Sequence, residues 1–312
     1  MSEYAKEVSS IEVSSVQEYI SVIEKLRKNY TYSFPPCIID GNPTEKMQTY
    51  IPRFIYRGHG NHENYKLLPG VYREECSLST DYSLIEYNIL ADFISEACRY
   101  VPNIPKDDAV SWLEIAQHFG VPTRLLDFTQ NPLVALYFAC SKYHQTEKSK
   151  GYMGAVWIIN EPVYSRSLLG ENVLAHAVNS KINVSKIVNE QLIYFDGFKQ
   201  INRPSSEFYF PPRIYKPLYS EERMTTQASV FMIWDLDHVD LLSFLKPCHF
   251  MSLSNEAKNK EDGVLFCICI PPDKKPEIMR QLDSCGINEK FIFPGIDGIG
   301  KYISRKYKHT PF

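Results

Sequence analysis

The sequence predicts an α+β fold, a single compact domain with a mixed or antiparallel β core flanked by helices. The chain has 312 residues, 44% of them apolar, which is enough to bury a sizeable core. Helical and strand patterns are interleaved, but without the regular alternation of a doubly wound parallel sheet. No clear linker or internal repeat divides the chain. We therefore expect one domain over residues 1–312, with an N-terminal helix at 14–30 and a core at 50–305.

Apolar residues at helical spacing, together with end signals, predict the helices. At 14–30, Ser15 and Glu18 occupy the positions of a capping box. Helix 108–119 stops at Gly120, a typical helix-ending residue. Asn131-Pro132 opens the next helix, where proline is tolerated in the first turn. Further helices are expected at 82–99 and 274–285.

Short apolar runs bounded by turn residues predict the strands. These runs are 54–58, 124–129, 154–159, 228–234, 263–270 and 290–293. The stretch from Tyr30 to Thr49 contains several prolines and is expected to be loop. Between Glu161 and Lys216 the signal indicates only short, mixed elements.

Composition excludes several classes of protein. With 34 basic and 37 acidic residues the formal net charge is −3, which argues against non-specific nucleic-acid binding but leaves a local basic groove open. No apolar run is long enough to span a membrane, and the N-terminus lacks the layout of a signal peptide. The eight cysteines show no zinc-type spacing, and Cys267 and Cys269 are expected to share one strand face as small apolar side chains. We expect a cytoplasmic protein with reduced thiols, no membrane partner and no metal.

The first polar cluster is Tyr56-Arg57-Gly58-His59-Gly60. An arginine at a strand end can present its guanidinium to a phosphate, and a following glycine permits close backbone approach. The alternative is a structural arginine bonded to a buried carboxylate.

The second cluster is HFGVPTRLLDFTQNPLVALYFA, residues 118–139. Strand alternation puts Asp127 and Thr129 on one face, just before a helix N-terminus where an anion or ribose can bind. In the plainer interpretation, Arg124 and Asp127 simply pair, and the apolar helix after them is core.

Two further clusters follow late in the chain. Residues 221–231 run from Glu221, Glu222 and Arg223 through Gln227 into an apolar strand, and a solvated approach to a core strand explains them equally simply. FPGIDG, residues 293–298, is also explained by turn chemistry alone.

Taken together, YRG at 56–58, the 118–139 segment, the ER…Q…F pattern at 222–231 and FPGIDG at 293–298 resemble the FRG domain family. The resemblance spans roughly residues 14–305, and the 118–139 segment is its specific part. One departure is visible. The resemblance leads us to expect Gln-Gly before the phenylalanine, but this chain has Gln227-Ala228-Ser229, so a backbone role for a glycine is in question there.

The order of these elements is also distantly similar to the ADP-ribosyltransferase layout, which implies NAD as substrate. By that resemblance Arg57 grips the phosphates or the nicotinamide ribose, and Thr129 with Asp127 shapes the nicotinamide pocket. The group that orders the ribose 2′-hydroxyl is Glu222, Gln227 or Asp297. The NAD-binding residues implied in addition are Tyr56, Gly58, His118, Thr123, Arg124, Asn131 and Arg223.

Three functions follow from these patterns. The first is an enzyme that transfers ADP-ribose to a protein or nucleic acid, or hydrolyses NAD, as a bacterial toxin or phage-defence effector. Breaking the nicotinamide–ribose bond develops positive charge, which calls for a positioned anion and little acid–base machinery. The second is a non-catalytic module that binds a nucleotide or nucleic acid. The third is a nuclease or other hydrolase using His59, His118 and Asp127.

The chain is rich in Tyr and Phe, with 21 and 17 respectively. Many of them flank the polar clusters. They are either the walls of a pocket for a flat ring or ordinary core residues. These are Tyr56, Phe119, Phe128, Tyr137, Phe138, Phe231 and Phe293.

Overall fold

A computed structural model describes most of the chain. The described residues are 10–34, 38–39, 42–43, 48–63, 66–73, 82–141, 151–169, 211–217, 222–234, 239–253 and 263–307. Cys37, Cys76 and Glu221 lie outside them.

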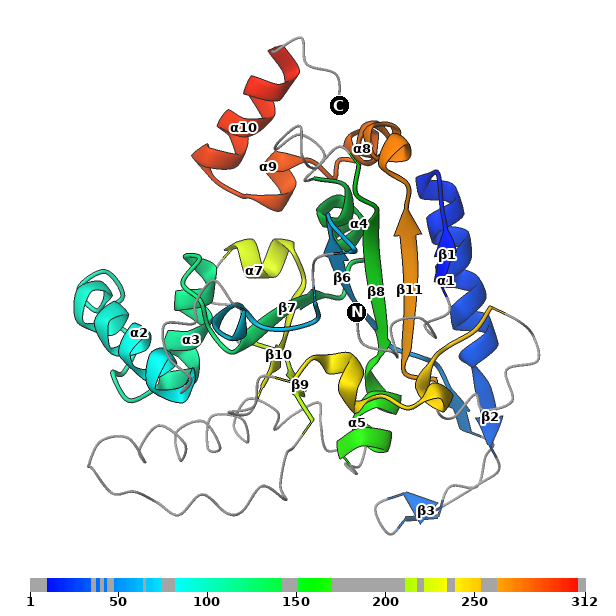
Figure 1. Cartoon of the computed structure of the whole chain (residues 1–312), viewed down its shortest axis with the longest axis horizontal. Helices are drawn as coiled ribbons and strands as arrows, with labels where there is room; N and C mark the ends of the chain where they lie inside the picture. Colours follow the sequence, from blue (N-terminus) through cyan, green and yellow to red (C-terminus); the bar gives the residue numbers. More distant parts are fainter. Residues whose placement is uncertain are drawn as a thin grey trace.

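A seven-stranded sheet forms the centre of the fold, in the order β1-β11-β8-β6-β7-β10-β9 (Figure 1). The outer strand β1 is parallel to β11 and every other neighbour pair is antiparallel, so the sheet is mixed. Its strands are β1 (Ser10–Glu12), β6 (Phe54–His59), β7 (Leu125–Thr129), β8 (Gly154–Asn160), β9 (Arg213–Tyr215), β10 (Ser229–Ile233) and β11 (Leu265–Ile270). The motif at 56–58 therefore lies on the central strand of the sheet.

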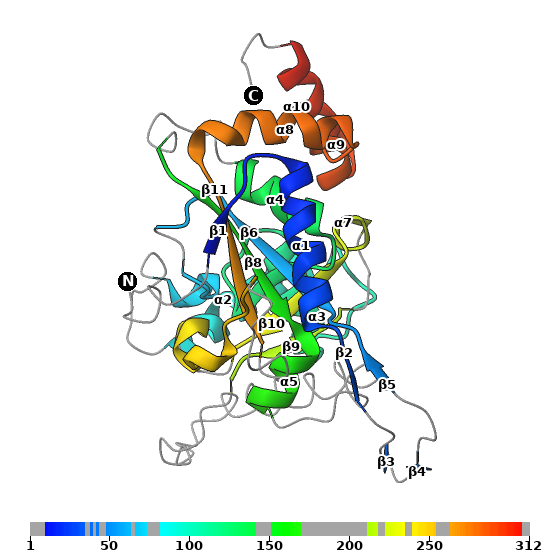
Figure 2. The ribbon, with the colours of Figure 1, turned by 90° about the vertical axis from the view of Figure 1, so that its right-hand side faces the viewer.

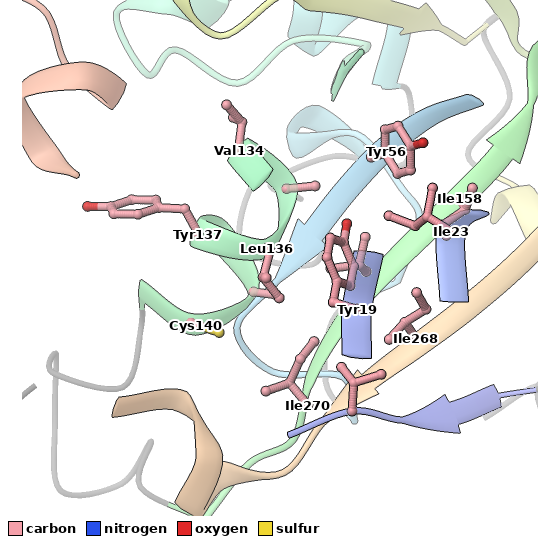
Figure 3. Packing of buried hydrophobic residues seen from close by; sticks show 14 of the residues in the cluster. Tyr19, Ile23, Tyr56, Val134, Leu136, Tyr137, Cys140, Ile158, Ile268 and Ile270 are labelled. Atoms are coloured by element: carbon pink, nitrogen blue, oxygen red, sulfur yellow. The ribbon is translucent and has the colours of Figure 1, made fainter. Parts of the chain in front are cut away.

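Helices cover one face of this sheet in two groups. The first group, α1 (Val16–Tyr30), α4 (Pro132–Ser141) and α8 (Lys275–Ser284), packs over β6, β8 and β11 (Figure 2). In that layer Tyr19 and Ile23 of α1 and Leu136 of α4 meet Ile158 and Ile268 of the sheet (Figure 3). The second group, α2 (Tyr82–Ala97) and α3 (Ala109–His118), packs over β7, β10 and β9. Helix α4 of the first group and α3 of the second line one pocket together with β6 and β7, so the seam between the two groups lies over these strands.

The other face of the sheet is covered mainly by loops and short helices. Leu67, Val71 and Leu241 from these segments pack on Trp157 and Cys267 of the strands. The other elements are α5 (Glu161–Leu169), α7 (Glu222–Thr226), α9 (Glu289–Ile292), α10 (Ile296–Tyr307) and the small strand pairs β2 (Tyr32–Phe34) with β5 (Gln48–Tyr50) and β3 (Ile38–Ile39) with β4 (Asn42–Pro43). Within the described residues, no helix is both long and apolar enough to cross a membrane.

The predicted α+β class is confirmed, and several local signals act as expected. The Ser15 hydroxyl accepts a hydrogen bond from the Glu18 backbone N–H at 3.1 Å and caps α1. Gly120 after α3 and Gly286 after α8 both have φ of +81°, a left-handed conformation that glycine adopts without steric cost. Cys267 and Cys269 do share one face of β11.

Two predictions are wrong, and one strand was not predicted. Residues 290–293 are not a strand but lie largely in helix α9, because the Asn288 side chain caps the N–H groups of Lys290 and Phe291. A four-residue apolar run cannot separate a strand from a short buried helix. The expected loop between Tyr30 and Thr49 contains short strands, and the three-residue strand β1 has too little pattern to detect.

The second cluster contains a buried ion pair that the sequence does not reveal. The guanidinium of Arg124 pairs with the carboxylate of Glu86 in α2, and their side chains are only 1% and 2% exposed. Glu86 also accepts the Arg124 backbone N–H at 2.8 Å. The pair therefore fastens α2 to the start of β7, and the predicted pairing of Arg124 with Asp127 is wrong.

Glu86→Gln is expected to lower the free energy of unfolding by about 3–5 kcal/mol, because it leaves the buried Arg124 charge without a counter-ion. Equilibrium urea denaturation measures this. Glu96→Gln, at an exposed position of the same helix, is the matched control and is expected to stay within about 0.5 kcal/mol of the unmodified chain. Equal effects of the two substitutions would contradict a structural role for the pair.

Candidate active site

The sheet opens between its two central strands. In the described residues β6 and β7 pair only at Tyr56 and Thr129, whereas β6 pairs with β8 along its whole length. Beyond that single pair the strands separate, directly below the seam between the helix groups. A pocket of about 250 Å³ occupies this position.

Six elements supply the lining of this pocket. Strand β6 contributes residues 56–58 and β7 contributes residues 127–129. Helices α3, α4 and α7, the turn after α7 and strand β10 contribute Gln117, His118, Val134, Ala135, Phe138, Arg223, Met224, Gln227, Ser229 and Phe231. Eight of the residues predicted from sequence thus meet at one place: Tyr56, Arg57, Gly58, His118, Asp127, Thr129, Arg223 and Gln227.

Arg57 bridges the opening between the strands. Its Nη1 donates to the Asp127 carbonyl oxygen at 2.6 Å, and its Nε donates to Nε2 of His59 at 3.0 Å. Burial lowers the pKa of Arg57 to about 10, and the nearby Asp127 charge opposes that shift. The guanidinium therefore stays charged at neutral pH. The buried-carboxylate alternative considered for Arg57 is wrong, and it applies to Arg124 instead.

Gly58 brings helix α4 against the central strand. A Cβ at this position would lie 1.9 Å from the Ala135 carbonyl oxygen and 2.7 Å from the Ala139 nitrogen. No side chain fits there without moving the helix. The sequence suggested that Gly58 lets a bound anion approach the backbone, but the close approach seen at Gly58 is that of α4, which supplies one wall of the pocket.

Asp127 projects into the pocket from the middle of β7. Its side chain accepts a hydrogen bond from Gln117 Nε2 at 2.6 Å, and Gln117 in turn accepts one from the Thr123 hydroxyl at 2.8 Å. Thr123 itself is buried and does not line the pocket. It thus acts as a support for Gln117, and Gln117 fixes the carboxylate of Asp127.

Thr129 and Asn131 hold the ends of three elements together. The Thr129 hydroxyl donates to the Gln227 carbonyl oxygen at 2.5 Å and accepts the Asn131 N–H at 2.9 Å. The Asn131 side chain accepts the Leu133 N–H at 3.0 Å and so caps α4. Asn131 lies outside the pocket lining, and its contact is structural.

The second arginine of the pocket comes from α7. Arg223 lies 4.9 Å from the centre of the Phe293 ring, and burial lowers its pKa while Asp127 opposes the shift. Phe293 also packs edge-on against Phe138 at 6.4 Å. Two guanidinium groups thus line the pocket together with the carboxylate of Asp127, an arrangement that suits a ligand carrying an anionic group.

Four of the predicted aromatic residues, Tyr56, Phe128, Phe138 and Phe231, line the pocket. Phe119 is 67% exposed, and Tyr137 and Phe293 lie behind the lining. The pocket is somewhat smaller than the roughly 300–1,000 Å³ of a drug-sized ligand site. A pocket of this volume has room for one ring with its attached group but not for a complete dinucleotide.

Three other predicted residues lie away from the pocket. Glu222 is exposed at the start of α7, and Asp297 is exposed in the first turn of α10. Arg124 is buried with Glu86. Of the three candidates for the late polar group, only Gln227 reaches the pocket, and its Nε2 donates to the Ile292 carbonyl oxygen at 2.9 Å.

Sequence reasoning missed Gln117 and Ser229. Gln117 directly precedes the cluster that starts at His118 and lies in the last turn of α3. In the sequence, Gln117 is marked only by its position directly before His118 at the end of a helix. Ser229 lies opposite Thr129 in the register of β10 and β7, which is visible only once that pairing is known.

The fold and this pocket define an α+β protein whose central sheet opens between two strands under a layer of helices. The sequence model of the FRG domain matches residues 52–148. This chain therefore contains an FRG domain, which covers β6, α2, α3, β7 and α4. No curated protein and no solved structure matches the chain.

The departure at Gln227-Ala228-Ser229 has a conformational counterpart. Ala228 has φ of +46°, the one positive φ outside glycine among the described residues. This left-handed region costs an ordinary L-residue roughly 1–2 kcal/mol. The turn that places Gln227 is thus of the kind that glycine prefers.

Ala228→Gly is expected to raise the free energy of unfolding by about 1 kcal/mol, because glycine removes the steric cost of the left-handed conformation. Ala91→Gly, at an exposed position within α2, is the control and is expected to lower it by about 1 kcal/mol. Chemical denaturation measures the free energy of unfolding of both variants. Destabilisation by both to the same extent would show that position 228 is not strained.

Proposed function

We propose that this protein acts on NAD, breaking the bond between nicotinamide and ribose. The products are nicotinamide and either free ADP-ribose or ADP-ribose attached to a protein or nucleic acid. The observation that supports this most is the meeting of Arg57, Arg223 and Asp127 in one aromatic-lined pocket. The ADP-ribosyltransferase-like order of the sequence motifs gives the same reaction class.

The charges of the pocket suit this substrate. Arg57 and Arg223 are positioned to bind phosphate oxygens, since guanidinium forms charge-assisted hydrogen bonds with them. The aromatic side chains offer faces for a flat ring. A pocket of about 250 Å³ fits the nicotinamide end, with the adenosine end outside.

Asp127 is the group best placed to stabilise the reaction. As the glycosidic bond breaks, its electron pair leaves with the nicotinamide nitrogen and positive charge develops on the ribose carbon. Asp127 is the one carboxylate among the described residues that line the pocket, and Gln117 holds it in place. A preorganised anion at this point lowers the barrier because it needs no reorientation during the reaction.

The fate of the ribose carbon depends on the late polar position. The residue there is the amide Gln227 rather than a carboxylate. An amide is a poor base for activating a protein side chain, so we favour attack by water or by a nucleic acid. With water, the added oxygen bonds to the ribose carbon and one proton is released. Consumption of NAD in this way suits a toxin or a phage-defence effector.

Incubation of the purified chain with NAD is expected to release nicotinamide, measured by liquid chromatography. Arg57→Ala and Asp127→Asn are each expected to slow release about 100-fold or more, since each removes a charge that acts on the transition state or the bound phosphates. Arg280→Ala, which removes an exposed arginine paired with Glu277, serves as the control and retains full rate. Absence of nicotinamide and of labelled acceptor in a lysate would refute the proposal.

A binding module without turnover is the second candidate. It is favoured by the hydrogen bonds that already engage Thr129, Asp127 and Gln227 within the protein. In a thermal-shift panel of NAD, ADP-ribose and AMP, we expect stabilisation that Arg223→Ala abolishes; a ligand at 100 times its Kd stabilises by about 2.7 kcal/mol. Stabilisation with NAD left intact identifies the binding module, and stabilisation with NAD consumed identifies the enzyme.

A further inference from the structure

A group of three metal-ligating side chains lies on the opposite face of the sheet from α4. Cys267 and Cys269 project from β11, and His62 follows the end of β6. One ligand atom of each lies within 4.8 Å of the others. None of the three lines the pocket described above. We propose that His62, Cys267 and Cys269 form a zinc site.

The distances suit a tetrahedral cation. The two sulfur atoms are 4.0 Å apart, and two zinc–sulfur bonds of 2.3 Å at the tetrahedral angle require about 3.8 Å. The alternating side chains of a strand hold both sulfurs on the same face. The three ligand atoms, which lie within 4.8 Å of one another, need to approach each other by at most about 1 Å to reach zinc-bonding distance.

The histidine has a ring nitrogen available for a metal. Its Nδ1 is buried, with no hydrogen-bond partner among the described residues. An unpartnered buried nitrogen costs free energy, and coordination would remove that cost. The His62 backbone N–H donates to the Met153 carbonyl oxygen at 2.8 Å, which fixes the residue beside β8.

Charge and access also favour a soft divalent cation. Two thiolates neutralise the charge of Zn²⁺, so a buried site is not left with a net charge. Thiolate and imidazole ligands select zinc over magnesium or calcium. His62 is half-buried, so a cation can enter at its side.

Spacing in the sequence cannot indicate this site. Cys267-Ile268-Cys269 alone reads as an apolar strand, and His62 lies at the other end of the chain. In the sheet, β8 lies between β11 and β6. The turn after β6 places His62 over β8. His62 packs against Trp157 of β8 at 5.7 Å. The proposed site, which differs from the expectation of no metal, therefore depends on tertiary structure.

Cobalt titration of the full chain, prepared without an affinity tag and under a non-thiol reductant, tests the proposal. One equivalent of Co²⁺ is expected to produce a sulfur-to-cobalt absorption band, and Zn²⁺ is expected to abolish it by displacement. Cys267→Ala and Cys269→Ala are expected to weaken cobalt binding at least about 100-fold, and His62→Gln about 10–100-fold. Cys140→Ala, also buried, and Cys285→Ala, exposed, are the matched controls and keep the band.

A second measurement covers the case in which the buried cysteine variants fail to fold. His62 is half-buried, so His62→Gln is expected to fold, as circular dichroism would verify. Zn²⁺ is expected to raise the Tm of the unmodified chain, because a ligand that binds only the native state stabilises it. Mg²⁺ is expected to leave the Tm unchanged. No cobalt band, a band that survives in His62→Gln at full affinity, or an equal Tm shift with zinc in that variant would overturn the proposal.

Discussion

The contact between helix α4 and strand β6 at Gly58 is the constraint on which the rest of the candidate site depends. The helix backbone lies so close to the strand that a single added methyl group would reach 1.9 Å from a carbonyl oxygen. This approach fixes α4 over the centre of the sheet. The start of α4 is in turn fastened to β7 through Thr129 and Asn131. The contact at Gly58 therefore determines the position of α4, which forms one wall of the pocket and is bonded to the end of β7.

The polar residues around this contact separate into two groups with different tasks. Arg124 and Glu86 are buried together and hold α2 to the sheet. Arg57 and Arg223 remain charged beside Asp127 at the pocket. The difference follows from exposure, because Arg124 is almost completely buried and needs a carboxylate beside it, whereas Arg57 is only half-buried at the pocket. Arg57 uses a backbone carbonyl and a histidine instead, so its charge is not neutralised by a buried partner.

The FRG match and the pocket overlap only in part. Residues 52–148 supply β6, β7, α3 and α4, which form the floor and two walls. The third wall comes from α7 and β10, and it contributes Arg223 and Gln227. The part of the pocket within the FRG match therefore carries Arg57 and Asp127, and the part beyond it carries the late polar group. The left-handed turn at Ala228 joins α7 to β10 and so controls where that group lies.

Much of the fold was predictable because its signals are local. The cap at Ser15, the glycine at position 120 and Pro132 each determine a helix end from neighbouring residues alone. Face-sharing of Asp127 with Thr129, and of Cys267 with Cys269, follows from the two-residue period of a strand. The prediction of a strand at 290–293 was wrong because a four-residue run is too short to show a period. The side chain of Asn288 caps this segment as the start of a helix.

The sequence by itself determined which elements form, which of their faces are apolar and which polar residues gather near strand ends. It did not determine how those ends meet. The strand order β11-β8-β6-β7-β10 brings Arg57, Asp127 and Gln227 into one pocket. In the same fold Arg124 pairs with Glu86, and His62 lies beside Cys267 and Cys269, which are far from it in the sequence. Only the tertiary structure decided these partnerships, because pairing between distant strands depends on how the whole sheet assembles, and no local pattern records it.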